Sequence, residues 1–560
     1  MNKADFEKHS NRFWLMILAA AAYFLLMFGN GMLSLTHPDE VFYMQSAKEM
    51  IQYRSWFVPM IFDWPQFEKP VFFYWLLILG IKFFGLSPFV ARLWPAIFGI
   101  IGVLAVFGMA WVMFRSKRTA FFSGMVLTVS FIHLAMSRAL LTDMTFSILT
   151  ILSLASFCFG YYERRYRDAG IFLFFVFMGL AVLTKGLLGV CFPFTVVLSF
   201  LMSQKELKFF KTPAAVWGTA VFLAIAVPWH FLMYKWYGST FIQEYWFNVH
   251  VRRLFVAEHP RNDTWYFYLL VMFAGMMPFS LLWPALLKSI TQTVKKGGGD
   301  SAKLTLLISW ILSTYGFVQV AHSKLASYIL PVFPAIAILM GYYLNRSLEL
   351  FERNAVTPKA IVFSGYGMAV FLIIGAVAGN IVAEHYREVV IHKQPVYFAS
   401  VLAVVWGGML IALNRKRKYF FLTVANAGVT LVLLIVIFLG IPMAEPWVSC
   451  KSVMDEFKTI DQSRSVILTS KFYVRGVRYY SDRPVAVINL RDKGFFSPHP
   501  IPFLSSEQKV LDFIKGEQVI YAIVRKNDLD ELRRIAEGHY RLAELGGAFG
   551  GKHIVKIESK

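Results

Sequence analysis

The chain has 560 residues, of which 57% are hydrophobic and 16% are charged, and its formal net charge is +22. This composition excludes an ordinary soluble protein, because apolar runs of about twenty residues recur along most of the chain and each can cross a membrane as a helix. The basic residues stand in short clusters between these runs. That is the positive-inside pattern of membrane proteins and not a nucleic-acid-binding surface.

The first apolar run is predicted to be an uncleaved membrane span. It is longer than the apolar region of a signal peptide, and no small-x-small cleavage site ends it. In all, the sequence predicts about thirteen spans. They are Phe13–Leu35, Pro88–Phe114, Ala120–Met136, Phe146–Tyr162, Ile171–Leu183, Leu187–Met202, Ala214–Leu232, Trp265–Leu287, Leu304–Val320, Tyr328–Leu344, Ala360–Val382, Tyr397–Leu413 and Tyr419–Ile441.

One ambiguous segment decides the predicted topology. Val71–Phe84 is apolar but only about fourteen residues long, which suits an interfacial or re-entrant helix better than a crossing. If it does not cross, the basic clusters between spans all lie on the side of the N-terminus, as the loop rule requires. We therefore expect a cytoplasmic N-terminus and an external C-terminus.

A change of composition near Ala444 separates two predicted domains. Residues 1–443 are expected to form an all-α polytopic membrane domain, with juxtamembrane helices in 37–86 and an external loop at 234–264. Residues 444–560 are expected to form a small α/β domain on the external face. Its predicted elements are strands at 466–468, 485–488, 519–524 and 554–557 and a helix at Asp528–Ala536. The glycines of Gly546–Gly551 are expected to interrupt regular structure before the last strand.

The first candidate site follows the first span, where the sequence reads His37-Pro38-Asp39-Glu40. Pro38 fits the first position of a helix, which puts both acids in its first turn. The acids could complement the helix dipole, or they could serve chemistry at the membrane surface. They could also hold a divalent cation, although two oxygen ligands alone make a weak metal site. Tyr43 lies four residues after Asp39 on the same helix face and could contact the same substrate.

The next candidates are isolated charges at the predicted external ends of spans. In Glu68-Lys69-Pro70 the lysine could bind a phosphate or extend to the interface as a snorkelling residue. Asp143 follows Arg138, so a local ion pair is the alternative to a functional role. Lys185 could mark a tight external turn.

The predicted external loop from Tyr234 to Thr264 carries Glu244, His250, Arg252, Arg253, Glu258 and His259. Long loops in compact proteins are often functional, and an arginine there could bind a phosphate through two hydrogen bonds. The histidines lack the spacing of a common metal motif. Further on, Lys324 and Tyr328, four residues apart, could reach a phosphate or a sugar.

These motifs, in this order, resemble the polyprenyl-phosphate-sugar glycosyltransferases with the C-type fold. The likeness is greatest to the bacterial lipid A 4-amino-4-deoxy-L-arabinose transferases, which are relatives of the protein O-mannosyltransferases, and it covers nearly the whole chain. The matching motifs are the acidic pair, Glu68-Lys69-Pro70, Ala91-Arg92-Leu93, the Asp143 region, Leu183-Thr184-Lys185-Gly186, and the stretch from Ser323 to Pro331.

The resemblance implies roles for individual residues. Asp39 is the expected catalytic carboxylate, Lys69 and Arg253 are expected to contact phosphate, and Glu68 is expected to be the ligand of a divalent metal ion. The full predicted set has catalytic residues Asp39, Glu40 and Asp143, and substrate contacts Tyr43, Lys69, His250, Arg252, Arg253, Lys324 and Tyr328.

The implied activity is transfer of a sugar, expected to be 4-amino-4-deoxy-L-arabinose, from undecaprenyl phosphate to a lipid A phosphate. It would take place on the periplasmic face of the bacterial inner membrane, with inversion at the anomeric carbon. An enzyme like the protein O-mannosyltransferases, or one with another acceptor, is the nearest alternative. A lipid-linked sugar transporter is the alternative from another class; its charges would be expected near mid-membrane in paired half-helices, whereas here they cluster on one face.

Overall fold

The computed structural model describes residues 3–386, 393–490, 494–495, 499–515 and 519–559. It divides into two compact units. Unit 1 comprises residues 1–29 and 92–439, and unit 2 comprises residues 30–91 and 440–560. Unit 2 thus combines the predicted juxtamembrane segment with the predicted C-terminal domain, while the domain boundary at residue 443 stays a prediction.

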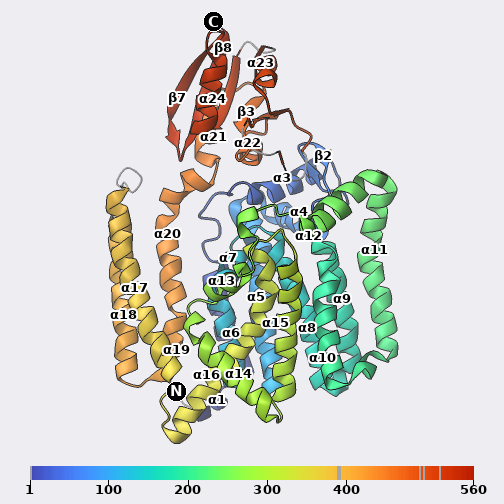
Figure 1. Ribbon diagram of the computed structural model, residues 1–560, viewed down its shortest axis with the longest axis vertical. Coiled ribbons are helices and arrows are strands. Elements are labelled where there is room, and N and C mark those ends of the chain that lie inside the picture. The colour runs from blue at the N-terminus through green and yellow to red at the C-terminus, as the bar shows by residue number, and fades with distance from the viewer. Residues whose placement is uncertain (1–2, 387–392, 491–493, 496–498, 516–518, 560) are drawn as a thin grey trace. The chain divides into compact units, whose positions relative to one another are not determined.

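Unit 1 is built of helices (Figure 1). They are α1 (Lys3–Lys8), α2 (Asn11–Ala22), η1 (Tyr23–Met27), α5 (Pro88–Phe114), α6 (Lys117–Val129), α7 (Phe131–Ser137), α8 (Thr142–Tyr162), η2 (Arg164–Tyr166), α9 (Arg167–Lys185), α10 (Leu188–Gln204), η3 (Leu207–Phe210), α11 (Pro213–Phe241), η4 (Ile242–Val251), α12 (Arg252–Phe255), η5 (Pro260–Asn262), α13 (Phe267–Gly275), η6 (Ser280–Leu282), α14 (Trp283–Lys296), α15 (Ser301–Val320), η7 (Ala326–Val332), α16 (Phe333–Asn354), α17 (Lys359–His385), α18 (Gln394–Arg415), α19 (Tyr419–Ala427) and α20 (Val429–Val448). Helices α5 and α20 continue into unit 2.

Small residues let the helices of unit 1 pack closely. Helix α8 packs along α9, and α9 also packs against α10 and α11. A Cβ atom added at Gly170 of α9 would lie 2.6 Å from the Ser156 carbonyl oxygen and 2.7 Å from the Cα atom of Gly160 in α8. Only glycine permits this approach, as at other close helix crossings in membranes.

Within the described part of the chain, nine helices are long and apolar enough to cross a membrane, or up to eleven if each of two bent pairs is one span. The predicted number of about thirteen therefore stays a prediction. The predicted end of the first span is wrong, because its apolar helix runs from Asn11 to Met27 and not to Leu35. The chain turns just beyond it at Gly29, whose φ of 76° suits glycine.

Two predicted straight spans are bent helix pairs. In place of Ala120–Met136, helices α6 and α7 meet at 61°. The break is at Ser130, which takes an extended conformation. In place of Trp265–Leu287, α13 and the segment Ser280–Lys296 meet at 112°. Pro278 lies in that break, where its missing N–H cannot continue a helix.

The prediction of an external loop over Tyr234–Thr264 is also wrong for most of its length. Helix α11 continues to Phe241, and η4 and α12 extend the helical path to Phe255. Gly238 bends the chain with a φ of 51° without ending the helix. The sequence has few helix-breaking residues between these points, so the polar residues that suggested a loop lie on a bent helix.

Unit 2 contains short helices and two sheets. Its elements are α3 (Asp39–Gln52), β1 (Met60–Ile61), β2 (Trp64–Pro65), α4 (Phe72–Phe84), α21 (Lys451–Ile460), β3 (Ile467–Ser470), α22 (Val474–Ser481), β4 (Val485–Ile488), β5 (Phe503–Leu504), α23 (Glu507–Lys515), β6 (Val519–Arg525), α24 (Lys526–Ala536), β7 (Tyr540–Phe549) and β8 (Lys552–Ser559). The predicted strands and the predicted helix in this region are confirmed, whereas β5, β7, α21, α22 and α23 were not predicted.

The larger sheet has the strand order β5-β4-β3-β6-β8-β7. Strands β3, β4, β5 and β6 are parallel, and β8 runs antiparallel to both β6 and β7. Every residue of β3 and β4 is buried, as expected for parallel strands covered on both faces. The chain leaves β3 toward β4 and returns beside β3 as β6. The carboxyl ends of β3 and β6 are thus the point where the strand order reverses.

Charged contacts join the two chain segments of unit 2. The Arg478 guanidinium contacts both carboxylate oxygens of Asp63, at 2.9 and 2.8 Å, across 415 residues of sequence. Lys48 Nζ donates to an Asp482 carboxylate oxygen at 2.5 Å. Helix α22 packs directly against α3, and the Arg478–Asp63 hydrogen bonds join it to the turn of the β1–β2 hairpin.

Candidate functional site

The acidic pair predicted after the first span lies in the first turn of α3, with Pro38 at the N-cap. Its two members have different environments. The Asp39 side chain is 62% exposed. Glu40 is buried, and its Oε2 accepts hydrogen bonds of 2.9 Å from both the backbone N–H and the hydroxyl of Thr36. Asp39 is therefore the acid available to a substrate, and a catalytic role for Glu40 stays a prediction.

Tyr43 and Lys69 lie in the same unit as Asp39. The Tyr43 ring is buried and packs edge-on against Phe73. Lys69 Nζ donates to the Glu68 carbonyl oxygen at 3.0 Å, within its own tripeptide motif. Both residues stay predicted substrate contacts.

Arg475, near the start of α22, is a residue that sequence reasoning missed. Its guanidinium lies 3.7 Å from an Asp39 carboxylate oxygen and 3.8 Å from a Glu68 carboxylate oxygen. Thus two motifs singled out in the sequence meet at one cation. Nothing in the local sequence around Arg475 points to this contact, because its partners lie at the other end of the chain.

Unit 1 brings Asp143, Lys185 and Tyr328 together. Lys185 Nζ donates to an Asp143 carboxylate oxygen at 2.6 Å, and both side chains are less than a tenth exposed. The same ammonium lies 4.4 Å from the centre of the Tyr328 ring, a cation–π contact. Residues from three separate sequence motifs thus form one cluster.

Arg138, the alternative partner considered for Asp143, makes other contacts. Its guanidinium donates to the carbonyl oxygens of Leu25 and Phe28, each at 2.8 Å. These bonds hold α7 to the end of the first apolar helix. Lys185, which lies 42 residues away in the sequence, donates a hydrogen bond to Asp143.

His250 lies against the turn that follows Lys185. A Cβ atom added at Gly186 would be 2.5 Å from His250 Nε2 and 2.6 Å from the Tyr245 hydroxyl oxygen, and the φ of Gly186 is 78°. His250 Nδ1 lies 2.8 Å from the Tyr245 carbonyl oxygen. Only glycine at position 186 permits both the turn and this close approach.

A second charged cluster in unit 1 is centred on Asp263, which sequence reasoning also missed. Its carboxylate accepts hydrogen bonds from His322 Nδ1 at 2.7 Å and from Lys324 Nζ at 2.9 Å. These bonds lower the pKa of Asp263 below its ordinary value. Lys324, a predicted substrate contact, is only 4% exposed and is paired with Asp263 in this structure.

Helix α12, which carries Arg252 and Arg253, contacts the segment that contains His322 and Lys324. Arg253 Nη2 is 3.2 Å from a Glu258 carboxylate oxygen, and the Arg253 carbonyl oxygen accepts a hydrogen bond from the Ser323 N–H at 3.0 Å. The helical segment and the segment before η7 are thus held together. Roles for Arg252 and Arg253 in binding substrate stay predictions.

Among the residues that the structure describes, no group of three or more His, Cys, Asp or Glu side chains could hold a metal ion. Asp39 and Glu68 share the Arg475 guanidinium, so a cation already lies beside both carboxylates. The carboxylates of Asp39 and Glu68 alone offer fewer oxygen ligands than the six to eight that a calcium ion takes. A metal at Glu68 therefore stays a prediction, and no chemical step below depends on it.

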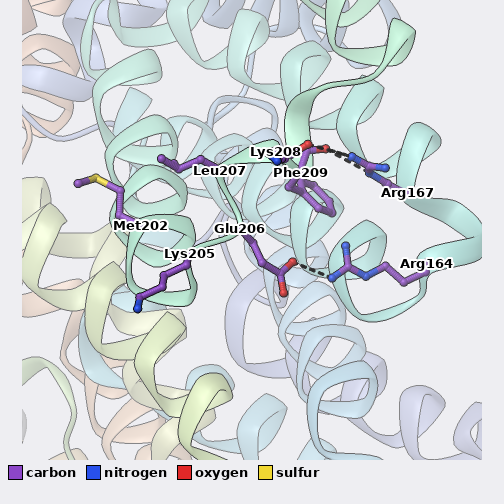
Figure 2. A pocket seen from close by; sticks show the side chains of 8 residues that line it. All are labelled: Arg164, Arg167, Met202, Lys205, Glu206, Leu207, Lys208 and Phe209. Atoms are coloured by element: carbon purple, nitrogen blue, oxygen red, sulfur yellow. Dashed lines mark hydrogen bonds and ion pairs between the residues drawn. The ribbon is translucent and has the colours of Figure 1, made fainter.

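A cavity of about 800 Å³ in unit 1 contains none of the predicted site residues. Figure 2 shows its lining, which includes the basic residues Arg164, Arg167, Lys205 and Lys208. Arg164 forms an ion pair of 2.8 Å with Glu206. The four basic residues come from two of the clusters between predicted spans, Arg164/Arg165/Arg167 and Lys205/Lys208/Lys211, whose charge bias supports the predicted orientation, so we assign them no chemistry.

Known proteins similar to this chain are glycosyltransferases. Residues 12–241 match the family described as dolichyl-phosphate-mannose-protein mannosyltransferase. A protein of Enterobacter sp. (strain 638), named undecaprenyl phosphate-alpha-4-amino-4-deoxy-L-arabinose arabinosyl transferase, is 26% identical over 71% of each chain. A protein of the same name from Yersinia pestis (strain Pestoides F) is 23% identical over 80% of each chain.

The fold is also that of a solved structure. The crystal structure of ArnT from Cupriavidus metallidurans bound to undecaprenyl phosphate matches with a TM-score of 0.79 at 21% identity, over 97% of this chain and 98% of that one. The resemblance, the C-type fold and the glycosyltransferase class predicted from the motifs are therefore confirmed. The chain is a multi-pass inner-membrane protein.

Proposed function

We propose that this enzyme transfers 4-amino-4-deoxy-L-arabinose from undecaprenyl phosphate to a phosphate of lipid A. The observation that carries the proposal is the similarity to the arabinosyl transferase of Enterobacter, which extends over 71% of both chains. The candidate residues support it, because they supply carboxylates and cations suited to a phosphate-linked donor.

The proposed reaction is a single displacement at the anomeric carbon. An oxygen of the acceptor forms the new bond to that carbon, and the bond to the undecaprenyl phosphate oxygen breaks with its electron pair leaving on the phosphate. Attack opposite the leaving group inverts the carbon. A phosphate monoester has a second pKa of about 6, so it needs neutralisation of charge and not protonation to depart. Lys69 is the cation that we propose for this neutralisation, and the phosphate contact of Arg253 that the resemblance implies stays a separate prediction.

Asp39 has the exposure that a residue in direct contact with substrate needs. A phosphate acceptor is already anionic, so Asp39 would orient the sugar or the acceptor and need not remove a proton. A hydroxyl acceptor would require Asp39 as a general base. Replacing Asp39 by Asn should therefore abolish transfer to a hydroxyl acceptor without loss of folding.

We further propose that the N-terminus is cytoplasmic and that residues 444–560 are periplasmic. The basic clusters between spans support this orientation by the loop rule. Single cysteines placed near Asp39 should react with a membrane-impermeant thiol reagent added to intact spheroplasts. Labelling of these cysteines only after lysis would overturn both the orientation and a periplasmic reaction.

Mass analysis of lipid A and of envelope proteins from a deletion strain tests the acceptor. We expect lipid A to lose a mass corresponding to aminoarabinose and to regain it when the gene is restored. The match of residues 12–241 to the protein mannosyltransferases favours one second candidate, sugar transfer to protein. Loss of protein glycans with unchanged lipid A would establish that candidate instead.

A further inference from the structure

Arg475 connects the C-terminal residues of unit 2 to the acidic candidates. Its Nη1 atom lies 3.7 Å from Asp39 Oδ1 and its Nη2 atom lies 3.8 Å from Glu68 Oε1. These are ion-pair distances, longer than those of hydrogen bonds. The guanidinium therefore acts on both carboxylates through charge and position.

The guanidinium itself is held from two other sides. Its Nη2 atom donates a hydrogen bond of 3.1 Å to His499 Nε2. Burial, followed by the charge of Arg475, lowers the pKa of His499 to about 4, so the imidazole is neutral near pH 7 and can accept this bond. The guanidinium carbon lies 4.5 Å from the centre of the Phe42 ring. The Arg475 side chain is only 15% exposed, which fits a group fixed by its surroundings.

Arg478 follows one turn later on α22 and makes a different contact. It binds Asp63 through both carboxylate oxygens at 2.9 and 2.8 Å and lies 3.8 Å from Glu49. Both hydrogen bonds come from Nη2 of Arg478, and they hold α22 to the β1–β2 hairpin. Helix α22 thus carries one arginine with a structural contact and another that faces two predicted functional carboxylates.

Arg475 also lies shortly after a strand of the larger sheet. It lies five residues after Ser470, the last residue of β3, at the point where the strand order reverses. In open α/β sheets the carboxyl ends of the strands at this point commonly present functional groups. Here that edge presents a cation to Asp39.

We propose that Arg475 is a positioning residue for the transfer reaction, holding the Asp39 and Glu68 carboxylates in a fixed arrangement. This inference rests on the proposed function and deepens it, because it gives the C-terminal residues a part in catalysis. Without the guanidinium, two carboxylates that share one cation would repel each other. The exposed Asp39 side chain would then turn away from its substrate.

The test measures kcat and KM of the full-length protein in detergent, with undecaprenyl-phosphate-linked aminoarabinose as donor and lipid A as acceptor. Arg475→Gln should lower kcat by about 100-fold, the loss that misplacement of a reacting group by about 1 Å can cause, with little change in KM for the donor. Arg475→Lys should recover part of kcat, because lysine restores the charge but not the planar fork. Arg478→Gln is the matched control: it should lower the unfolding temperature but keep kcat near the wild-type value.

An Arg475→Gln variant with wild-type kcat would overturn the inference, as would equal losses of kcat in Arg475→Gln and Arg478→Gln. If Arg475→Gln does not fold, Arg475→Lys decides the question: it must lose kcat while its unfolding temperature stays near that of the wild type. Failure of the wild type to transfer this sugar to lipid A would instead overturn the proposed function, whatever Arg475 does.

Discussion

The buried pair of Asp143 and Lys185 allows a quantitative prediction. Their side chains are 9% and 8% exposed and their charged atoms are 2.6 Å apart. Removing one partner leaves the other charge buried without its counterion, which costs about 3–5 kcal/mol. We therefore expect Asp143→Asn and Lys185→Met each to lower the free energy of unfolding by about that amount. The double variant should be more stable than the sum of the two losses implies, by about 2 kcal/mol.

The assay is reversible unfolding of the purified protein in mixed detergent micelles. Asp143→Asn combined with Arg138→Gln is the control, because Arg138 hydrogen-bonds to backbone carbonyls of the first apolar helix. Those two losses should add. Additive losses for Asp143 and Lys185 would refute the reasoning from the buried pair. Activity then tests the predicted catalytic role of Asp143, since a folded double variant that transfers sugar normally would exclude it.

Three further predictions concern other charged groups. Asp263→Asn should lower the free energy of unfolding by about 1.5–3 kcal/mol, the value of hydrogen bonds to charged groups. Most of that loss should be absent when Asp263→Asn is added to a Lys324→Met background. Unfolding curves of the wild type, the two single variants and the double variant measure this difference. Lys69→Ala should abolish sugar transfer without a change in unfolding temperature. Lys82, which lies over the Trp56 ring, is the control, and Lys82→Ala should keep transfer. Normal transfer by Lys69→Ala would show that Lys69 is not needed to bind the donor phosphate. Burial and then the charge of Lys552 lower the pKa of His37 from 6.5 to about 4. As the pH falls from 7 to 5, His37 therefore takes up a proton in the unfolded chain but not in the folded protein, and the free energy of unfolding should fall by about 2 kcal/mol. A His37→Gln variant with the same pH dependence of unfolding would contradict this.

The sequence could predict those parts of the site that rest on local signals. Pro38 before two acids predicted the start of a helix, and α3 begins at Asp39. A short apolar run with β-branched residues predicted Val485–Ile488, and β4 has those bounds. In each case neighbouring residues determine the conformation.

Contacts between distant segments could not be predicted in this way. Lys185 was considered as a turn residue and Asp143 as a partner of Arg138, but packing of α8 against α9 brings Asp143 and Lys185 together. Asp263 has no motif around it, and only the fold places it beside Lys324. The same holds for the bends at Ser130 and Pro278, where apolar composition continues through the break and hides it.

The discontinuous make-up of unit 2 has a consequence for biogenesis. Asp63 leaves the ribosome 415 residues before Arg478, its partner, and contacts so distant in sequence form late because a long chain must close first. The helices of unit 1 that follow residue 91 are synthesised in the interval. A nascent or truncated chain can therefore insert into the bilayer while its Asp39 carboxylate still lacks Arg475. Competence for sugar transfer would then arise only when synthesis is nearly complete, which protects the lipid-linked donor from half-made enzyme.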